Sequence, residues 1–504
     1  MIRRNILANA VGGSATLLLN LIVTPFLIRI LGAEAYGLLG LMTSLQIVFA
    51  VLDLGLSTTI VKEIASDTSA DRSATHGLVG TLALVYWSVA LALGAVIFFE
   101  ANWIATRWLH LQTLRPEDAI LGIRILALSV ALRWPVSFYG GVITGAQELV
   151  RFNVVKVAST LVRLGMGLIV LLVTRDLRTY LWWMALSALF EVLAYGTASI
   201  RLHPALRGWP TFEWRALRKV WQFSLSMNLI AILSIVFTQA DRIVISHLRP
   251  LTELGYYSLA VSVVMSVSVI QGFITSAILP AFAADHSAGL STRLRERYDK
   301  ATQALIYIIT LPTCIFIFFG FEVLQVWTTT EAAERAAVVL ALFSLGFLFN
   351  ASVSIAYTLA VATGNTRLPL RVNLVALVAY VPGLYFGTSH WGIVGAASAW
   401  VVLNAYFLLL LLPLVQRLIV KASVTRWAAA NFFPFVLRGT VTFALAASIA
   451  NRLGGGRGPL IPLVLCGLAS AVYVVWGVYA VTPALRADLR HIVQSVLSRP
   501  NPAL

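Results

Sequence analysis

Long runs of apolar residues recur along almost the whole chain, and no other feature restricts its fold as strongly. An α-helix needs about 20 predominantly apolar residues to span the hydrocarbon core of a bilayer. Hydrophobic residues make up 59% of the 504 residues and charged residues 12%, against about 25% charged residues in a typical soluble domain. A chain with so few charges cannot cover a water-facing surface, so the sequence predicts an integral membrane protein.

The runs predict fourteen transmembrane helices and therefore an all-α polytopic membrane fold. We expect the first six near residues 8–31, 38–61, 77–99, 119–140, 154–174 and 179–200. The next six are expected near 221–246, 256–282, 302–325, 336–361, 371–388 and 393–415. The last two are expected near 431–451 and 459–481, before a basic tail. The eleventh run is the least regular because Pro382 and Gly383 interrupt it.

Two sequence patterns recur at nearly the same offset. The stretch Asn20–Gly37 is matched by Thr238–Tyr257, and Val142–Asn153 is matched by Val361–Asn373. Self-similarity at one offset indicates an internal repeat. Because each half contains an even number of helices, we expect parallel repeats related by an axis along the membrane normal, as in some secondary transporters.

This organisation predicts three regions. Residues 1–212 form an N-terminal lobe of six helices, residues 213–418 form a C-terminal lobe of six, and residues 419–504 hold helices 13 and 14 and a basic cytoplasmic tail. The connection 201–220, with Trp209, Pro210 and Trp214, is interpreted as an interfacial linker helix. It serves either as a plain tether or as a contact for lipid headgroups or a partner.

The net charge of +16 is interpreted as a topological signal. The basic residues are spread over many short loops without a stripe interleaved with aromatic residues, so the sequence does not indicate nucleic-acid binding. With the N-terminus inside, the inner loops and chain ends hold far more Lys and Arg than the outer loops. Cytoplasmic loops collect these residues, so both termini are expected in the cytoplasm. The first apolar run is too long for a cleaved signal peptide and is interpreted as a transmembrane helix.

Sequence motifs of enzymes are absent from the chain. The glycine-rich segment Gly454–Gly458 lacks the lysine of a phosphate-binding loop, and no outer loop is large enough to hold an active site. The two cysteines, Cys314 and Cys466, lie in apolar runs, and no spacing of His or Cys suggests a metal site. The sequence therefore predicts a protein that is not an enzyme and has no cofactor or metal.

Several charged residues fall within the predicted helices, where a charge costs about 2.5–3.5 kcal/mol by insertion scales and usually faces a cavity or a partner. Asp53, Arg133, Arg163 and Glu191 are expected deep in helices 2, 4, 5 and 6. Three more charges are expected toward the outer ends of helices 1 and 7: Arg29, Asp241 and Arg242.

Arg163 belongs to a polar stripe on helix 5. The stripe, spaced for one face of an α-helix, consists of Lys156, Ser159, Thr160, Arg163 and Gly167. It either lines a water-filled cavity or contains a buried ion pair between Arg163 and Glu191 on the next helix. Arg133, which precedes the helix-kinking Pro135, is the second candidate for the cavity.

The acids have structural and functional interpretations. Asp53 either caps a helix break at Gly55 or binds a coupling ion, and Asp241 either neutralises Arg242 or titrates during transport. Because arginines outnumber acids within the helices, the cavity should favour an anion, and guanidinium grips phosphate oxygens in two-point contacts. The candidate substrate-binding residues are Arg29, Arg133, Lys156, Arg163 and Arg242. The candidates for coupling to a proton or sodium ion are Asp53, Glu191 and Asp241.

The segment from Pro25 to Gly37, with Arg29, Gly32 and Tyr36, resembles the first-helix signature of bacterial lipid-linked oligosaccharide flippases. These proteins form the polysaccharide-transport branch of the multidrug/oligosaccharidyl-lipid/polysaccharide exporter superfamily. Further segments are similar to the family's second helix and to its junction of helices 7 and 8: Asp53–Leu56, Phe223–Ser224, Asp241–Ile245 and Leu254–Ala260.

The resemblance implies a V-shaped pair of six-helix lobes with two peripheral helices. It implies alternating access that moves an undecaprenyl-pyrophosphate-linked oligosaccharide to the outer leaflet for surface polysaccharide biosynthesis, of lipopolysaccharide or exopolysaccharide. It also implies the bacterial inner membrane, with membrane lipids and other glycan-assembly proteins as candidate partners.

Arg133 and Arg163 are candidates for the cationic lumen on their depth and face rather than on a family motif. Multidrug antiporters of the same superfamily are the alternative, although an arginine-rich lumen suits organic cations poorly. A membrane enzyme of glycan assembly is a further alternative.

Overall fold

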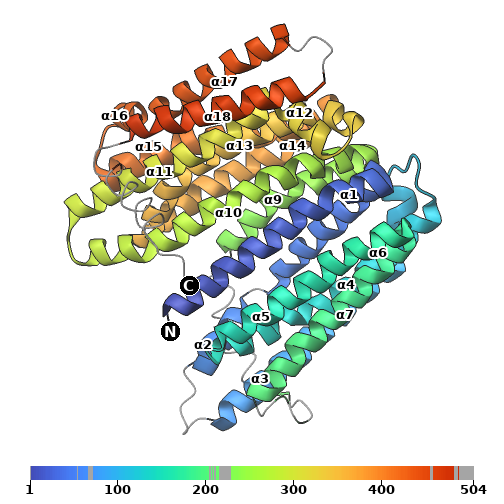
Figure 1. Cartoon of the computed structure of the whole chain (residues 1–504). Helices are drawn as coiled ribbons and strands as arrows, with labels where there is room; N and C mark the ends of the chain where they lie inside the picture. The colour runs from blue at the N-terminus through green and yellow to red at the C-terminus, as the bar shows by residue number, and fades with distance from the viewer. Residues whose placement is uncertain are drawn as a thin grey trace, which may run out of the picture. The chain divides into compact units, whose positions relative to one another are not determined.

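In the computed structural model the chain folds almost entirely into α-helices (Figure 1). The structure describes residues 2–53, 55–65, 72–203, 206, 208, 212–214, 229–453, 458–481 and 486. Of residues 2–18, 72–76 and 229–231 it describes the backbone alone. No β-strand occurs in these described ranges, so the predicted all-α fold is confirmed.

Eleven helical segments of the described chain are long and apolar enough to cross a membrane. Two of them contain a backbone break at a glycine, at Gly32 (φ 83°) in α1 (Ile2–Ala50) and at Gly392 (φ 58°) in α14 (Arg367–Tyr406). Positive φ is readily adopted by glycine because it has no Cβ, so each break separates two helical rods. Together with α9 (Leu229–Leu248), the described chain thus provides the fourteen rods that the sequence predicts.

The structure divides into two compact units. Unit 1 comprises Met1–Leu259 and Thr388–Ile393, and unit 2 comprises Ala260–Gly387 and Val394–Leu504. These units are defined by contacts and not by sequence repeats. The predicted division into regions 1–212, 213–418 and 419–504 and the parallel repeat stay predictions, and the linker residues Trp209 and Pro210 lie outside the described residues.

Unit 1 is built around α4 (Pro116–Gly145), which contacts both α3 (Arg72–Trp103) and α7 (Leu177–Leu202). Figure 1 shows these three helices side by side. The short α2 (Leu56–Ala65) packs against α3 and α4. A buried aromatic cluster of Tyr86, Trp134 and Phe138 fills the space between them.

The fifth predicted helix has an irregular centre. It runs as α5 (Leu149–Thr160), a π-helical segment η3 (Leu161–Met166) and α6 (Gly167–Thr174). A π-helical turn closes its hydrogen bonds one residue later than an α-helical turn, and such segments are frequent at functional sites. Arg163 lies within η3.

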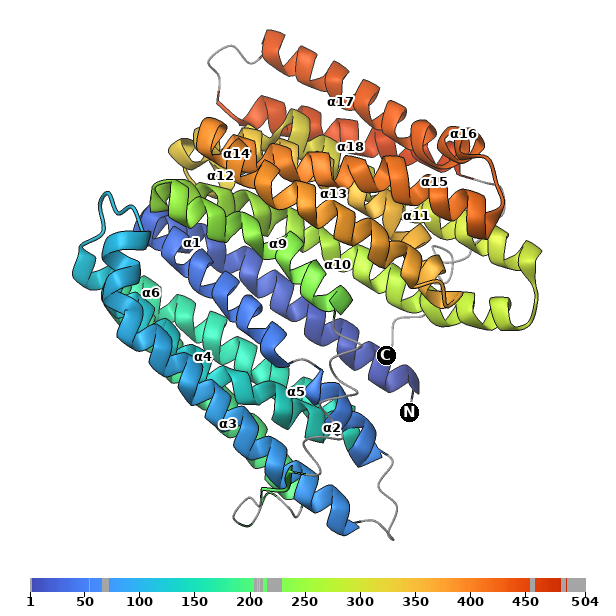
Figure 2. The same ribbon diagram turned by 180° about the vertical axis from the view of Figure 1, so that it is seen from behind.

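Unit 2 contains α11 (Ser291–Phe318), α12 (Gly320–Trp327), α13 (Thr330–Ala362), α17 (Phe433–Leu453) and α18 (Leu460–Ala480). Figure 2 shows α17 and α18 side by side, and both helices contact α11. Between α14 and α17, π-helical turns connect the short helices α15 (Leu412–Val415) and α16 (Val424–Trp427).

The predicted helices 256–282 and 302–325 leave residues 283–301 as a connecting loop, and this expectation is wrong. Helix α10 (Leu251–Ser287) continues to Ser287 and α11 begins at Ser291, so nearly the whole segment is helical. Arg297 Nη1 lies 3.0 Å from Asp285 Oδ2 and Arg293 Nε lies 3.8 Å from Asp285 Oδ1, which ties the two polar helix ends together. A search for apolar runs detects the part of a helix that faces lipid and misses such polar extensions.

Candidate functional site

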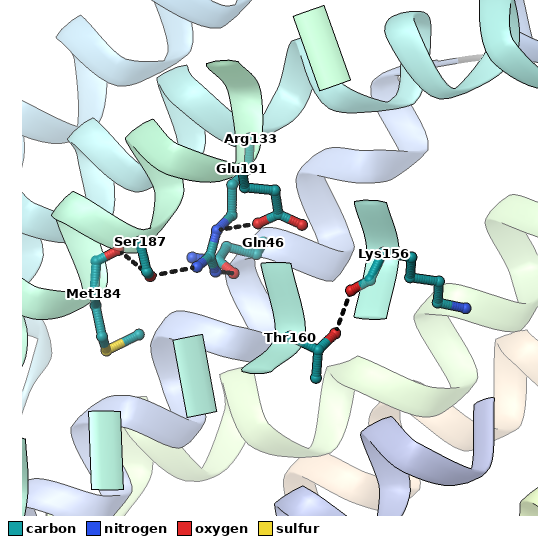
Figure 3. A network of polar contacts seen from close by, with 7 residues as sticks. All are labelled: Gln46, Arg133, Lys156, Thr160, Met184, Ser187 and Glu191. Carbon is teal, nitrogen blue, oxygen red and sulfur yellow. Dashed lines mark hydrogen bonds and ion pairs between the residues drawn. The ribbon is translucent and has the colours of Figure 1, made fainter. Parts of the chain in front are cut away.

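Arg133 of α4 lies at the centre of a polar network inside unit 1 (Figure 3). Its Nε lies 3.1 Å from Oε2 of Glu191 on α7, and the two side chains are 13% and 23% exposed. Nη1 donates to Gln46 Oε1 on α1 at 3.3 Å, and Nη2 donates to Ser187 Oγ on α7 at 3.3 Å. The guanidinium thus joins three helices that the sequence separates widely.

Glu191 pairs with Arg133 and not with Arg163, the partner suggested by the sequence. The helical spacing of Arg133 and Glu191 gave no means of matching them, because their meeting depends on how α4 and α7 pack. Removing one partner of a buried ion pair is expected to be strongly destabilising, since the other charge then lies unpaired at low dielectric. Arg133 therefore has a structural contribution whatever its part in transport.

Arg163 has no ion-pair partner in the described part of the chain, and its side chain is half-buried. Arg163 lies close enough to Arg133 for the two positive charges to repel each other. The charges of both arginines also interact with the side chain of the buried Tyr180. The Arg133–Glu191 pair is neutral overall, so Arg163 adds one uncompensated positive charge beside it. This arrangement creates a local potential that favours an anion.

Gly167, the last residue of the predicted polar stripe on helix 5, lies at the contact with α7. A methyl group at Gly167 would lie 3.3 Å from the Trp183 ring, so this residue packs against α7. The indole N–H of Trp183 donates to the Val162 carbonyl oxygen at 3.2 Å, which ties the π-helical segment to α7. The wider π turns shift the residues after Thr160 out of the α-helical register that the prediction assumed.

Lys156 lies one helical turn before the π segment and is half-buried. Its carbonyl oxygen accepts a hydrogen bond from Thr160 Oγ1 at 2.8 Å, and Figure 3 shows its amine directed away from Arg133. Lys156 therefore contributes a second cation to helix 5 without joining the Arg133 network.

Asp53 ends a short 3₁₀ segment, η1 (Val51–Asp53), which follows α1 just before a break at Gly55 (φ 78°). Its Oδ2 accepts from Ser57 Oγ at 2.7 Å and from the Ser57 backbone N–H at 3.4 Å, which caps α2. Its Oδ1 accepts from the hydroxyl of Tyr86 and from Ser137 Oγ at 3.3 Å. The capping geometry agrees with the structural interpretation, and the carboxylate has hydroxyl donors but no cationic partner in the described chain.

A cavity of about 290 Å³ opens beside this cluster. Its lining includes Ser57, Ser137, Thr144 and Tyr195, which bring hydroxyl groups from α2, α4 and α7. Most of the cavity surface is apolar and Asp53 is not among its lining residues, so ion coupling at Asp53 stays a prediction.

Asp241 and Arg242 of α9 do not form an ion pair through their side chains, both of which the structure describes. Asp241 is 2% exposed, and its Oδ2 accepts from the Tyr257 hydroxyl at 2.5 Å. Arg242 Nη1 donates to Gln239 Oε1 at 3.1 Å. The charge of Arg242 nevertheless acts on the Asp241 carboxylate, so both interpretations, neutralisation by Arg242 and titration of Asp241 during transport, stay predictions. Arg29, the remaining candidate, has an exposed side chain before the break at Gly32 and is not a partner of Arg133.

One end of unit 1 is closed by a backbone contact that sequence reasoning missed. A methyl group on Gly37 would overlap the Leu251 carbonyl oxygen, and one on Gly255 would overlap the Ala33 carbonyl oxygen. We call this meeting of Ala33–Gly37 with Leu251–Gly255 the hairpin contact. The sequence signal was present, because these glycines belong to the recurring patterns, but a repeat does not reveal that its two copies touch.

The loop between α3 and α4 strengthens the hairpin contact. Glu34, which is 3% exposed, accepts from the backbone N–H groups of Gln112 at 2.6 Å, Thr113 at 2.6 Å and Leu114 at 2.9 Å. On the other side, Thr252 Oγ1 donates to Gln112 Oε1 at 2.8 Å. The buried carboxylate thus fixes a loop that holds both hairpins.

Comparisons with known proteins agree with this architecture. Residues 2–285 match the profile of a family described as polysaccharide biosynthesis protein, and residues 227–386 match the profile of the MatE family. The chain is 23% identical over 388 residues to a putative O-antigen transporter of Shigella flexneri, covering 76% of this chain and 91% of that protein.

Two solved structures show the same fold. The lipid II flippase MurJ in an inward closed conformation superposes with a TM-score of 0.73 at 11% identity, covering 98% of this chain and all of that chain. A multidrug resistance MATE family transporter in an inward-facing conformation gives a TM-score of 0.67 at 15% identity, covering 82% of this chain and 95% of that one. At such identities these likenesses describe the fold alone.

Proposed function

Because the chain belongs to the polysaccharide biosynthesis protein family, whose profile matches more than half of its length, we propose that it is a flippase. It moves an undecaprenyl-pyrophosphate-linked oligosaccharide from the cytoplasmic to the outer leaflet, for the synthesis of a surface polysaccharide. No covalent bond of the substrate changes, so the protein acts as a transporter and not as an enzyme. The similarity to a putative O-antigen transporter supports this substrate class.

The observation that carries the proposal is the uncompensated charge of Arg163 beside the Arg133–Glu191 pair. A diphosphate crossing the membrane must lose much of its hydration, which is costly unless cationic donors replace the water. Arginine supplies two parallel N–H donors that match phosphate oxygens, and Lys156 adds a second cation on the same helix. The substrate-binding residues of this proposal are therefore Arg163, Arg133 and Lys156.

Alternating access is supported by the hairpin contact. Lys and Arg are sparse in the loops around 32–37 and 247–255, so we place this end of unit 1 on the outer face, with both termini in the cytoplasm. Gly392 at the bend of α14 lies against Arg249 and Glu253, which adds a further outer loop to the same end. The described conformation of unit 1 is then closed toward the outside, and substrate release requires these hairpins to separate.

A coupling ion would bind at one of the acids that the arginines leave available. Asp53, with three hydroxyl donors, and the buried Asp241, with Tyr257, are the proposed sites for a proton or sodium ion. Glu191 is a weaker candidate because Arg133 neutralises it. Membrane lipids surround the protein in the bacterial inner membrane, and glycan-assembly enzymes are the proposed partners.

A cation antiporter is the second candidate, because residues 227–386 match the MatE family profile. Reconstitution into proteoliposomes separates the two functions. We expect a fluorescent polyprenyl-diphosphate oligosaccharide in the inner leaflet to become accessible outside at a rate well above that of protein-free vesicles. Organic cations such as ethidium should not be exchanged. Cation exchange without lipid translocation would favour the antiporter and refute the flippase.

A further inference from the structure

A groove lies along the packed pair α17 and α18 in unit 2, and none of its lining residues belongs to the polar network described above. It has a volume of about 590 Å³. Its lining is apolar apart from one arginine and consists of Phe433, Pro434, Leu437, Arg438, Val441, Trp476 and Ala480. Several of these side chains are widely exposed, Leu437 at 57% and Trp476 at 42%, as expected of a surface that contacts lipid.

Arg438 is held in this groove without an opposite charge. Its Nη1 donates to the Pro434 carbonyl oxygen at 2.7 Å, and its Cζ lies 5.4 Å from the centroid of the Trp476 ring. Its Nε is buried and has no hydrogen-bond partner in the described part of the chain. No carboxylate of the described residues lies within ion-pair distance of it. The Pro434 carbonyl and the Trp476 ring contact part of the guanidinium, but its positive charge has no counter-charge in the described chain.

The direction of the Arg438 side chain locates the groove relative to the membrane. The bond to Pro434 turns the guanidinium back by one helical turn toward the start of α17. Ala480, the last residue of α18, lines the same groove, so the groove ends where that helix ends. Arginine extends in this way toward the polar interface, and tryptophan concentrates at the same level. The guanidinium therefore reaches the depth of lipid phosphate groups.

We propose that this groove binds one anionic phospholipid of the surrounding membrane. The phosphate accepts hydrogen bonds from the guanidinium of Arg438, whose side chain is half-buried. The acyl chains lie along the apolar side chains of Leu437 and Val441, which follow the level of the headgroup along α17. Charge complementarity selects the occupant, because an uncompensated cation at the end of an apolar groove matches an anionic headgroup followed by hydrocarbon chains. This inference does not depend on the proposed function.

The test is lipid retention by the delipidated, purified protein in native mass spectrometry, with phosphatidylglycerol and phosphatidylcholine as probes. Wild-type protein should retain phosphatidylglycerol preferentially. Loss of one charge-assisted contact should weaken phosphatidylglycerol binding by about tenfold or more in Arg438→Ala. Arg452→Ala is the matched control, because Arg452 is an exposed arginine at the other end of the same helix, outside the groove. It should bind as the wild type does.

Two further variants keep the test interpretable. Arg438→Gln preserves size and hydrogen bonding if Arg438→Ala fails to fold, and it should also lose the preference for phosphatidylglycerol. Arg438→Lys keeps the charge and should retain part of that preference.

Equal retention of the two lipids by wild-type protein, or unchanged retention in Arg438→Gln, would overturn the proposal. Displacement by inorganic phosphate would show an anion site that does not recognise lipid. Displacement by an added polyprenyl diphosphate at equal concentration would assign the groove to an isoprenoid lipid instead. Either result overturns the proposal.

Discussion

Removing one partner of the Arg133–Glu191 pair should lower the free energy of unfolding by more than the intact pair contributes to it. With side chains 13% and 23% exposed, both charges are largely withdrawn from water. Removing one partner of a buried pair costs about 3–5 kcal/mol, and the partial exposure of Glu191 places Arg133→Gln near the lower end, at about 3 kcal/mol. Glu191→Gln should cost a similar amount, because Arg133 would keep only its bonds to Gln46 and Ser187.

The double variant Arg133→Gln/Glu191→Gln carries the decisive comparison. It removes both charges, so the penalty of an unpaired buried charge disappears, and its loss should fall short of the sum of the single losses by about 1–3 kcal/mol. Unfolding in mixed micelles, followed by circular dichroism at increasing dodecyl sulfate, gives the four free energies. Losses that add within about 0.5 kcal/mol would refute the pairing as the source of the stability.

Three further predictions follow from other contacts. Gly255→Val should stabilise states in which the hairpins are apart, because a side chain at this position overlaps Ala33. In a background with the substitutions Ala33→Cys and Thr252→Cys, this change should slow disulfide formation between the two cysteines. An unchanged rate of cross-linking would contradict the closed end. Asp53→Asn should remove any dependence of translocation on the pH gradient if Asp53 binds the coupling proton, and an unchanged dependence in proteoliposomes would leave it as the cap of α2. The Asp176 carboxylate accepts a hydrogen bond from the Thr179 backbone N–H at 2.8 Å, which lowers the pKa of the carboxyl, and Asp176→Ala should reduce the free energy of unfolding by about 1 kcal/mol. This difference between wild type and variant should be present above the ordinary carboxyl pKa and should fade as the pH falls through the lowered pKa. A difference that does not depend on pH would contradict the prediction.

The helical fold could be predicted from the sequence because the membrane restricts what the backbone can adopt. Backbone groups in lipid must be satisfied within each segment, so every long apolar run becomes a helix. The break at Gly32 and the turn at Gly392 fall where apolar runs meet loop residues, and both were expected as connections. The polar extension of α11 was missed because its charges are satisfied by Asp285 outside the apolar region.

Residue type was enough to single out the charged residues within the helices, but not to identify their partners. Arg133, Glu191, Arg163 and Asp53 were singled out because charges in apolar runs are costly, and the structure gives each a polar or electrostatic environment. Their partners depend on helix packing, so the choice between Arg133 and Arg163 for Glu191 was beyond sequence spacing. The π-helical segment around Arg163 was also unpredictable, because it is a departure from the regular spacing on which the prediction rested.

The most direct test of the account is the rate of lipid-linked oligosaccharide translocation by Arg163 variants in proteoliposomes. Arg163→Ala should fold and insert normally but translocate at close to the protein-free rate. Arg163→Lys should recover part of the rate, because an ammonium cannot make the planar two-point contact. Arg124→Ala is the matched control, since Arg124 is an exposed arginine on α4 that lies over the Phe98 ring, and it should translocate as the wild type does. Wild-type translocation by well-folded Arg163→Ala would contradict the claim that this cation recognises the diphosphate.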